Sequence, residues 1–282
     1  MSEQQFLNRA VGLLVIEVVN SNPNGDPDQE SDPRTRTDEY GEISSVSFKR
    51  KLRNLVMMKD GPVWQEMSKT LQSPERFEIL ESPQRNRREI AKMEIQDFLN
   101  TYWDARVFGT TFLEKNDKGG SAIRTGVVQF GLGVSVSKVE IERLTTTNQS
   151  GVQDEKTRGM APLGYRVVRH GVYCMPFFVN PTAAIRTNCS KEDIELMCRL
   201  ISYAYTHTSS YVRSDVRIRH AWYIEHQNSL GSCSDFMLLD AMKPVFKGER
   251  GTASTDWTDY QVPTDLPESL KTKVKGLRDL IP

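Results

Sequence analysis

The 282-residue chain carries 37 Lys and Arg residues against 37 Asp and Glu residues, so its formal net charge is zero. Charged residues make up 26% and hydrophobic residues 38% of the sequence, as in an ordinary soluble globular protein with one large or two modest domains. A neutral chain argues against a general polyanion binder, although a confined basic stripe can still hold phosphate through its local field.

The sequence shows neither a transmembrane segment nor a secretory signal. No apolar run approaches the roughly 18 residues that suggest a transmembrane helix, so we expect no membrane span. The opening Met-Ser-Glu-Gln-Gln lacks the basic and then apolar pattern of a secretory signal. The cysteines show no C-x-x-C spacing, and we expect free thiols in the reducing cytoplasm. They are Cys174, Cys189, Cys198 and Cys233.

The first predicted strand runs from Val11 to Asn20 and is rich in β-branched residues. This composition is typical of a central strand that is apolar on both faces. Residues 20–43 follow as a loop, because Pro, Gly, Asn, Asp and Thr dominate them. The loop opens with a stiff, turn-forming stretch from Asn22 to Asp28, Asn-Pro-Asn-Gly-Asp-Pro-Asp.

A helix is predicted next, capped by Ser44 or Ser45 and running to about Met58, with Phe48 and Leu52 on its apolar side. Its basic residues are expected elsewhere on the helix surface, near the start: Lys49, Arg50, Lys51 and Arg53. Cations there add to the exposed backbone N–H groups, which is unfavourable unless an anion offsets them. The loop and the helix start together predict an anion-binding site. The commonest anion that occurs as a repeating unit in a cell is the nucleic-acid phosphate.

In the middle of the chain the sequence predicts an inserted helical lobe, a strand and then a projecting loop or hairpin. After the break at Gly61-Pro62, residues 63–106 are predicted to be a mainly helical, polar lobe outside the core, which we place at about residues 60–125. Val127 to Ser137 alternates strictly and predicts one strand. Its apolar face would hold Val128, Phe130, Leu132, Val134 and Val136. Residues 144–163 are polar and turn-rich, and predict a projecting loop or a long hairpin.

The second half repeats the pattern of helix and strand. Ser190 opens a capping-box pattern, which predicts a helix from Lys191 to about Tyr205. A further strand is predicted from Arg217 to His226. One face of that strand would suit a nucleic-acid backbone and its bases. The residues expected on this face are Arg217, Arg219 and Tyr223.

The main elements therefore follow in the order strand, helix, strand, strand, helix, strand. This βαββαβ order predicts an α+β fold with a ferredoxin-like, RRM-like core in a single domain of residues 1–282. The inserted helical lobe and the projecting thumb-like hairpin extend that core. The polar tail after Lys247 is expected to be peripheral.

Motifs that carry catalytic chemistry are sparse. Alternating acids in the first loop could hold a hard cation, but they lack the EF-hand spacing and its closing glutamate, which favours a solvated turn. These acids are Asp26, Asp28, Glu30 and Asp32. The histidines lack the i, i+4 partner of a helical zinc site, and neither a G-x-S-x-G elbow nor a glycine-rich phosphate loop occurs. We therefore expect no metal, no cofactor and no catalytic residue.

Several stretches occur in an order that one family shares, and they span about residues 11–231. They are Asn22–Asp28 with Pro33-Arg34 and Thr37-Asp38, Lys49–Asn54, Asp104–Gly109, Arg124–Phe130, Gly164-Tyr165 with His170-Gly171, and His226–Gly231. Through them the chain resembles the Cas-seven family of the RAMP superfamily, the CRISPR-associated Cascade backbone subunits. Within that family it is most similar to the type I-C and I-B branch.

The resemblance implies an RNA-recognition-like core and a non-catalytic subunit that binds a CRISPR guide RNA. Copies of such a subunit stack in a helical filament along the guide, beside other Cascade subunits. A protruding thumb hairpin, which we place at about residues 138–165, kinks the guide and leaves the remaining bases free to pair with a target DNA strand. The protein then holds backbone phosphates without reading bases.

The basic helix start and the resemblance together assign candidate RNA-binding residues. The helix cations would hold guide phosphates, and two asparagines and a serine would support the junction between loop and helix. Arg124 and Gln129 would be second-line contacts, and Arg213 is what remains of the branch pattern after the second helix. The full set is Asn22, Asn24, Ser45, Lys49, Lys51, Arg53, Arg124, Gln129 and Arg213.

Two rival functions stay open. The first is a metal-dependent ribonuclease that uses Asp26, Asp28 or Asp32, since relatives in type III systems cut target RNA with a backbone-subunit aspartate. The second is a protein-binding scaffold that binds no nucleic acid.

Overall fold

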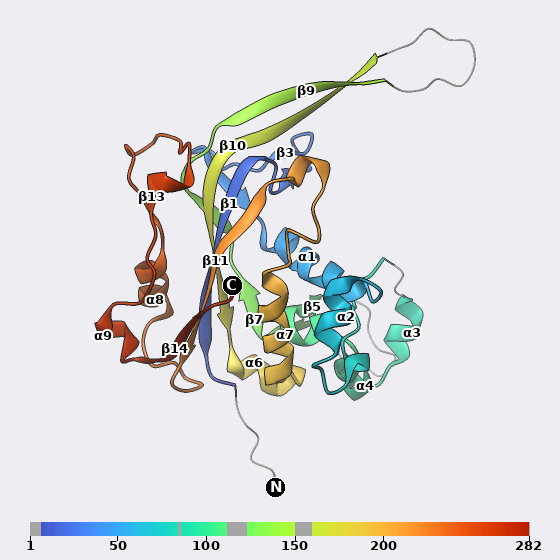
Figure 1. Ribbon diagram of the computed structural model, residues 1–282. Coiled ribbons are helices and arrows are strands. Elements are labelled where there is room, and N and C mark those ends of the chain that lie inside the picture. The colour runs from blue at the N-terminus through green and yellow to red at the C-terminus, as the bar shows by residue number, and fades with distance from the viewer. Residues whose placement is uncertain (1–6, 84–85, 112–122, 150–159, 282) are drawn as a thin grey trace, which may run out of the picture.

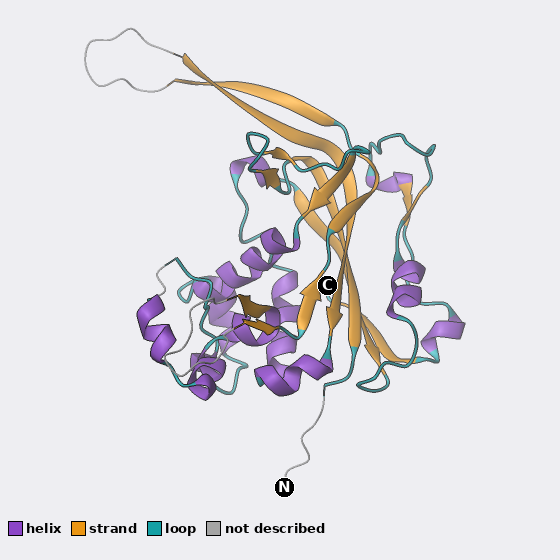
Figure 2. Cartoon of the chain, turned by 180° about the vertical axis from the view of Figure 1, so that it is seen from behind, coloured by secondary structure: helices purple, strands orange, loops and turns teal. Residues whose placement is uncertain are grey.

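The computed structural model describes residues 7–83, 86–111, 123–149 and 160–281. A twisted antiparallel sheet runs through the centre of the molecule (Figure 1). Helices gather on one side of this sheet, a smaller C-terminal layer lies on the other, and a two-stranded ribbon projects from one end (Figures 1 and 2). The architecture is a mixed α/β fold built on a large antiparallel sheet.

The central sheet has the strand order β14–β11–β1–β10–β8–β4, and β7 and β9 also pair with β10. Short antiparallel pairs join β2 to β3, β5 to β6 and β12 to β13. The strands are β1 (Ala10–Ser21), β2 (Gly25–Asp26), β3 (Asp32–Pro33), β4 (Tyr40–Ile43), β5 (Gly109–Thr111), β6 (Ile123–Thr125), β7 (Val128–Phe130), β8 (Gly133–Lys138), β9 (Ile141–Gln149), β10 (Met160–Val179), β11 (Val216–His226), β12 (Val245–Phe246), β13 (Tyr260–Gln261) and β14 (Val274–Asp279).

Helices follow the caps that the sequence provides. Ser44 caps α1 by accepting from the Ser47 amide at 3.2 Å, and Ser190 caps α7 in a complete capping box. Both predicted helix starts are confirmed, while α7 ends before the predicted Tyr205. The helices are α1 (Ser45–Met57), α2 (Pro62–Ser68), η1 (Pro74–Arg76), α3 (Arg87–Lys92), α4 (Ile95–Thr101), α5 (Trp103–Phe108), α6 (Pro181–Thr187), α7 (Lys191–Ile201), η2 (Tyr211–Arg213), α8 (Asp235–Met242), η3 (Trp257–Asp259) and α9 (Glu268–Lys271).

The first strand, β1, is buried on both faces, as its composition predicted. It lies between β10 and β11 and pairs antiparallel with both. Leu14 and Ile16 belong to the core beneath the helices, whereas Leu13 and Val15 belong to the core beneath the C-terminal layer. Successive side chains point to opposite faces of a strand, so β1 contributes to both cores.

The helical segment between α1 and β7 is part of the main core. It is mainly helical, as predicted, but the expectation that it lies outside the core is wrong. Trp64 of α2, Phe77, and Trp103 of α5 are buried in the same cluster as Phe48 of α1 and Phe177 of β10. Large apolar side chains in an otherwise polar segment need a partner surface, and the sheet side of α1 and α7 provides it.

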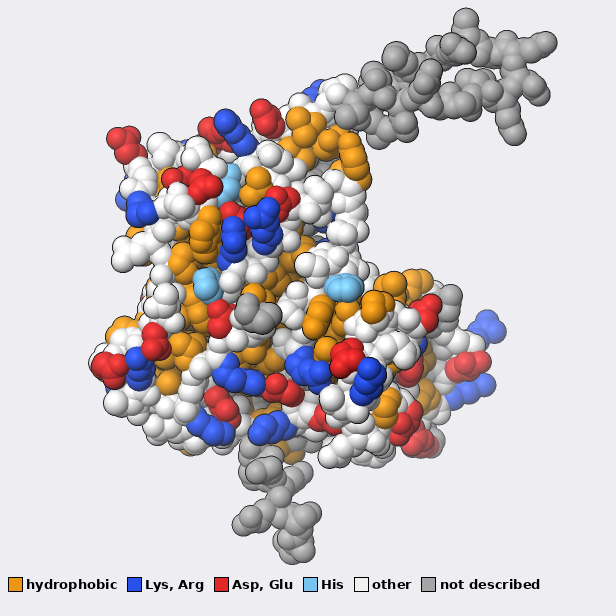
Figure 3. Space-filling model, in the orientation of Figure 1, with side chains coloured by type: hydrophobic (Ala, Val, Ile, Leu, Met, Phe, Trp, Pro, Cys, Tyr) orange, Lys and Arg blue, Asp and Glu red, His pale blue; other side chains and the backbone are white. Residues whose placement is uncertain are grey.

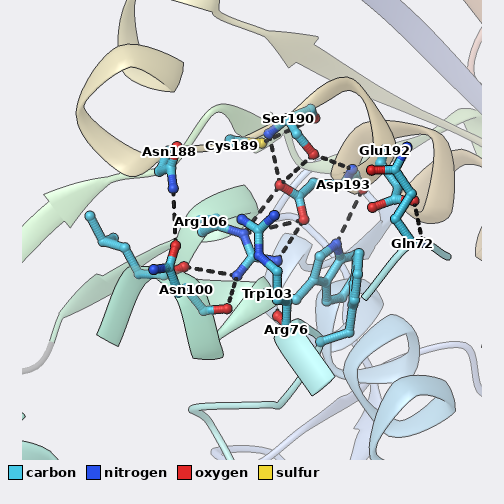
Figure 4. A network of polar contacts seen from close by, with 12 residues as sticks. Gln72, Arg76, Asn100, Trp103, Arg106, Asn188, Cys189, Ser190, Glu192 and Asp193 are labelled. Atoms are coloured by element: carbon cyan, nitrogen blue, oxygen red, sulfur yellow. Dashed lines mark hydrogen bonds and ion pairs between the residues drawn. The ribbon is translucent and has the colours of Figure 1, made fainter. Parts of the chain in front are cut away.

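A buried ion pair ties α5 to α7 (Figure 4). The Arg106 guanidinium donates to the Asp193 carboxylate at 2.7 Å, and both side chains are almost completely buried. Arg106 also donates to the main-chain oxygen of Leu99, and the Trp103 indole donates to the main-chain oxygen of Asp193. Because Asp193 closes the capping box with Ser190 as well, the start of α7 and the whole of α5 share one polar network.

The single strand predicted over residues 127–137 is broken, and this correction changes which side chains are buried. Phe130 pairs with Phe177 and Val134 pairs with Cys174. The segment from β7 to β8 therefore advances by four residues where β10 advances by three, so it contains one extra residue. The extra residue inverts the alternation after β7. Beyond it the apolar Leu132 is exposed and the small Ser135 is buried.

The C-terminal tail is not peripheral, contrary to expectation. Within the tail after Lys247, Tyr260, Leu266 and Leu270 are buried in the core on the second face of the sheet. The last strand, β14, pairs with β11 and extends the sheet. These apolar side chains are spaced too irregularly to predict a helix or a strand, yet together they cover one side of β1.

The basic and aromatic face predicted for β11 is divided by an irregularity in the strand. The register with β1 shifts where Val15 pairs with His220 and Ile16 with Ile218. Arg219 therefore lies over Trp257 in the C-terminal layer, whereas Tyr223 belongs to the core beneath the helices. The expectation that these two side chains share a face is wrong.

The projecting segment is a long hairpin. Strands β9 and β10 pair from Ile141 with Val168 out to Gln149 with Met160. Figure 1 shows this ribbon leaving the body of the molecule beyond the end of β1. Residues 150–159 of the predicted projection lie outside the described residues.

All four cysteines are free thiols, and Cys174, Cys189 and Cys198 are buried. Burial raises the pKa of Cys174 to about 12, so this thiol stays protonated and unreactive near neutral pH. Within the described ranges, no helix combines the length and apolar character that crossing a bilayer requires.

Replacing Arg106 should reveal how much the α5–α7 network contributes. We expect Arg106→Met to lower the free energy of unfolding by about 3–5 kcal/mol, because the buried Asp193 charge loses its partner. Urea unfolding followed by circular dichroism measures the change. The matched control is Lys69→Met, which breaks the exposed pair with Glu66 and should cost less than about 1 kcal/mol. Equal stability of the two variants would contradict the assignment.

Candidate nucleic-acid interface

The polar loop after β1 is held at both ends by asparagines. The main-chain amide of Asn22 donates to the main-chain oxygen of Val212 at 2.7 Å, which joins the loop to η2. Asn24 Oδ1 accepts from the Ser44 amide at 2.7 Å, which joins the loop to the cap of α1. Because Pro and short polar residues dominate the loop, its structure depends on these bonds rather than on apolar packing.

Lys51 is a buried cation that no carboxylate neutralises in the described part of the chain. Its side chain is 6% exposed, its Nζ donates to Thr208 Oγ1 at 3.0 Å, and it lies 4.6 Å from the centre of the Tyr205 ring. Burial, and then the nearby charge of Arg213, lowers the pKa of Lys51 to about 8. The site therefore favours an added negative charge.

Arg213 faces the same region from η2. Its Nε donates to the main-chain oxygen of Asn22 at 3.1 Å, and no described carboxylate pairs with it. Arg213 and Asn22 line a cavity of about 350 Å³, which we call the interface cavity. The other walls come from the loop at residues 25–32 and from the base of the β9–β10 ribbon, including Arg143 and Arg166.

The acids of the loop are already engaged. Asp32 forms an ion pair with Arg166 of β10, and Asp26 lies 3.8 Å from Arg34 and accepts from the Asp28 amide. Among the described residues, no group of three or more His, Cys, Asp or Glu side chains is placed to hold a metal ion. Asp32 thus fixes the loop against the ribbon, while Asp26 holds the loop to itself.

Two tyrosines at the base of the ribbon were missed by sequence reasoning. Tyr165 and Tyr211 form an edge-to-face pair with ring centres 5.3 Å apart, and Tyr211 is 72% exposed. Hydrophobic side chains gather where the ribbon leaves the body, while basic and acidic side chains are interspersed over the rest of that face (Figure 3). Exposed aromatic rings beside cations are suited to stacking bases. Tyr165 was within a recognised motif, but nothing in the sequence paired it with Tyr211.

Two further cations of α1, Arg53 and Lys49, are buried and partly buried, respectively. Arg53 is 8% exposed, pairs with Asp104 at 2.8 Å and lies over the Phe108 ring. The expectation that Lys51 and Arg53 lie on the helix surface is therefore wrong, because α1 packs on both sides. Burial and the charge of Arg53 also lower the pKa of Lys49, which is only partly exposed.

The other candidates lie in separate parts of the molecule, with Ser45 at the start of α1, Gln129 on β7 and Arg124 on β6. Ser45 opens α1 next to the capping Ser44 and is partly exposed. Gln129 is exposed on β7, which pairs with the end of β10 farthest from the ribbon, so it is not brought near Asn22. Arg124 lies in β6, and its side chain lies outside the described part of the structure.

Comparisons with known proteins give a family match over most of the chain. The family described as CRISPR-associated protein Cas7 matches residues 8–265. No curated protein sequence matches the chain.

Three solved structures are similar at low sequence identity. One belongs to a "CRISPR RNA-guided surveillance complex", with a TM-score of 0.44, 14% identity, and coverage of 76% of this chain and 69% of that chain. A second is titled "CRISPR RNA-guided surveillance complex, pre-nicking" and has a TM-score of 0.49 and 12% identity. The match covers 77% of this chain and 78% of that chain. The third, of "Type III-B Cmr-beta bound to cognate target RNA", has a TM-score of 0.43 and 10% identity. The match covers 77% of this chain and 61% of that chain.

The buried charge of Lys51 should appear in the pH dependence of stability. The folded pKa lies near 8 and the ordinary value is 10.5, so the unfolded chain binds more protons between these values. Stability of the wild type should therefore rise with pH across this window, with the destabilisation complete below pH 8. Lys51→Met should remove this slope and add about 2 kcal/mol near pH 7. Urea midpoints between pH 7 and 10 measure both effects, and parallel curves for the two proteins would contradict the assignment.

Proposed function

Because the chain belongs to the CRISPR-associated protein Cas7 family, we propose that it is the guide-RNA-binding backbone subunit of a CRISPR interference complex. The family predicted from the ordered motifs is confirmed, and the type I-C or I-B branch is part of the proposal. In this proposal, copies of the chain assemble as a helical filament along the guide with other Cascade subunits. The guide bases then remain free to pair with a target DNA strand.

The observation that carries the proposal is a pair of neighbouring cations, Lys51 and Arg213, of which Arg213 lines the interface cavity. Lys51 is buried and Arg213 lies close enough to lower its pKa, yet neither has a carboxylate partner among the described residues. Two like charges in such a place are unfavourable without an anion. A backbone phosphate supplies that anion whatever the base sequence, which a guide-holding subunit requires.

The proposed roles follow from position. Lys51 and Arg213 hold phosphates, and Lys49 is a further phosphate contact from the same helix. Asn22, Asn24 and Ser45 support the junction of loop and helix that positions them. Arg53 supports α1 through its pair with Asp104. Arg124 and Gln129 are second-line contacts on a separate part of the surface.

We also propose that the centre of the molecule is a ferredoxin-like core. The spatial order β11–β1–β10–β8 supports this, because it places the fourth, first, third and second strands of a βαββαβ unit side by side. Helices α1 and α7 contribute to the core cluster on one face of the sheet. The proposed single domain carries an inserted lobe at about residues 60–125 and a thumb at about residues 138–165, which includes the β9–β10 ribbon.

The proposed subunit holds RNA without cutting it. The rival ribonuclease needs loop aspartates free to bind a metal, whereas Asp26 and Asp32 already face Arg34 and Arg166. The rival protein scaffold gives no reason for two neighbouring cations, Lys51 and Arg213, that no described carboxylate neutralises. The proposed function therefore accounts for more of the interface than either rival.

Neutralising the cation pair should weaken RNA binding equally for all sequences. Lys51→Gln with Arg213→Gln should flatten the slope of log affinity against log salt by about 0.7 for each phosphate that the protein no longer neutralises. Fluorescence anisotropy with labelled oligoribonucleotides of unrelated sequence measures slope and affinity. Lys69→Gln, an exposed lysine on the helical side, is the control. A double variant with the wild-type salt slope would remove these residues from the interface.

A cleavage assay separates the proposal from the ribonuclease rival. Labelled RNA incubated with the purified protein and magnesium should remain intact over hours. Gel electrophoresis of the RNA is the measurement. Cleavage that disappears in Asp26→Asn would favour the rival instead.

A further inference from the structure

Asn22 carries a buried oxygen that has no hydrogen-bond partner among the residues that the structure describes. The residue is 5% exposed and lines the interface cavity. Its main-chain amide, its main-chain oxygen and its side-chain nitrogen are all engaged, by Val212, Arg213 and Ser31 respectively. No donor from the described part of the chain reaches the remaining polar atom, Oδ1.

The orientation of this side-chain amide is fixed by its surroundings. Asn22 Nδ2 donates to the main-chain oxygen of Ser31 at 2.8 Å. Exchanging the nitrogen and oxygen would bring two acceptors together, so the oxygen must be the atom without a partner. A buried acceptor of this kind is unfavourable until a donor reaches it.

A ribose–phosphate chain offers one type of donor that does not depend on the bases. Phosphate oxygens only accept, and deoxyribose carries no hydroxyl at its 2′ position. The 2′-hydroxyl of ribose donates and accepts, and it distinguishes RNA from DNA. Lys51 and Arg213 attract both polymers through phosphate, so they cannot make that distinction.

We propose that Asn22 Oδ1 accepts a hydrogen bond from a ribose 2′-hydroxyl and so makes the interface selective for RNA over DNA. This inference rests on the proposed function, because it assumes that the cation pair seats a nucleic-acid backbone. Asn22 then has two tasks. Its main chain holds the loop against η2, and its side-chain oxygen reads the sugar.

The test compares one oligoribonucleotide of mixed sequence with DNA of the same sequence. The wild type should bind the RNA more tightly, and Asn22→Ala should lower the ratio of RNA affinity to DNA affinity by about three- to tenfold. Gln65→Ala, which removes an exposed amide on α2, is the matched control and should keep the wild-type ratio. Thermal unfolding of each variant shows whether the loop change has altered the fold.

A second arm changes the ligand rather than the protein. Single 2′-deoxy substitutions along the RNA, tested on the wild type, should weaken binding at particular positions by a similar factor. Equal binding of RNA and DNA by the wild type, silent deoxy substitutions, or an unchanged ratio in a folded Asn22→Ala would each overturn the inference while leaving the proposed function intact. Failure to bind either polymer would instead overturn the proposed function, and this inference with it.

Discussion

The hydrogen bonds of Asn22 and Asn24 are the constraint on which the candidate interface depends. Asn22 joins the end of β1 to η2, and Asn24 joins the same loop to the cap of α1. Both asparagines are buried, so moving the loop would leave buried polar groups without partners. The positions of Lys51 and Arg213 follow from this, because one lies on the helix and the other on the segment that the loop fastens.

The strand β1 delivers that loop to a fixed place because it is the centre of the fold. Its alternate side chains enter two cores, one beneath the helices and one beneath the C-terminal layer. Strands β10 and β11 flank it on both edges, and β10 continues into the projecting ribbon. The loop, the ribbon base and η2 therefore meet at one end of a rigid sheet.

Four buried or half-buried cations in the described part of the chain differ in whether a carboxylate pairs with them. Arg106 and Arg53 are paired with Asp193 and Asp104, so their charge is satisfied within the fold. Among the described residues, Lys51 and the half-buried Arg213 have no such partner, which is why we propose that a ligand neutralises them. Burial strengthens both effects, since a charge in a low-dielectric place interacts more strongly with whatever neutralises it.

The sequence by itself determined the features that depend on neighbouring residues. The apolar run of β1, the serine caps of α1 and α7, and the turn-rich segment that became a hairpin all follow from local chemistry, and so did the pairing of a polar loop with a basic helix start. The tertiary structure alone decided that Arg53 meets Asp104, that Tyr211 meets Tyr165, that one extra residue inverts the burial after Phe130, and that the C-terminal tail covers a face of β1. These outcomes depend on residues far apart in the chain, and no local pattern records which of them will meet when the sheet closes.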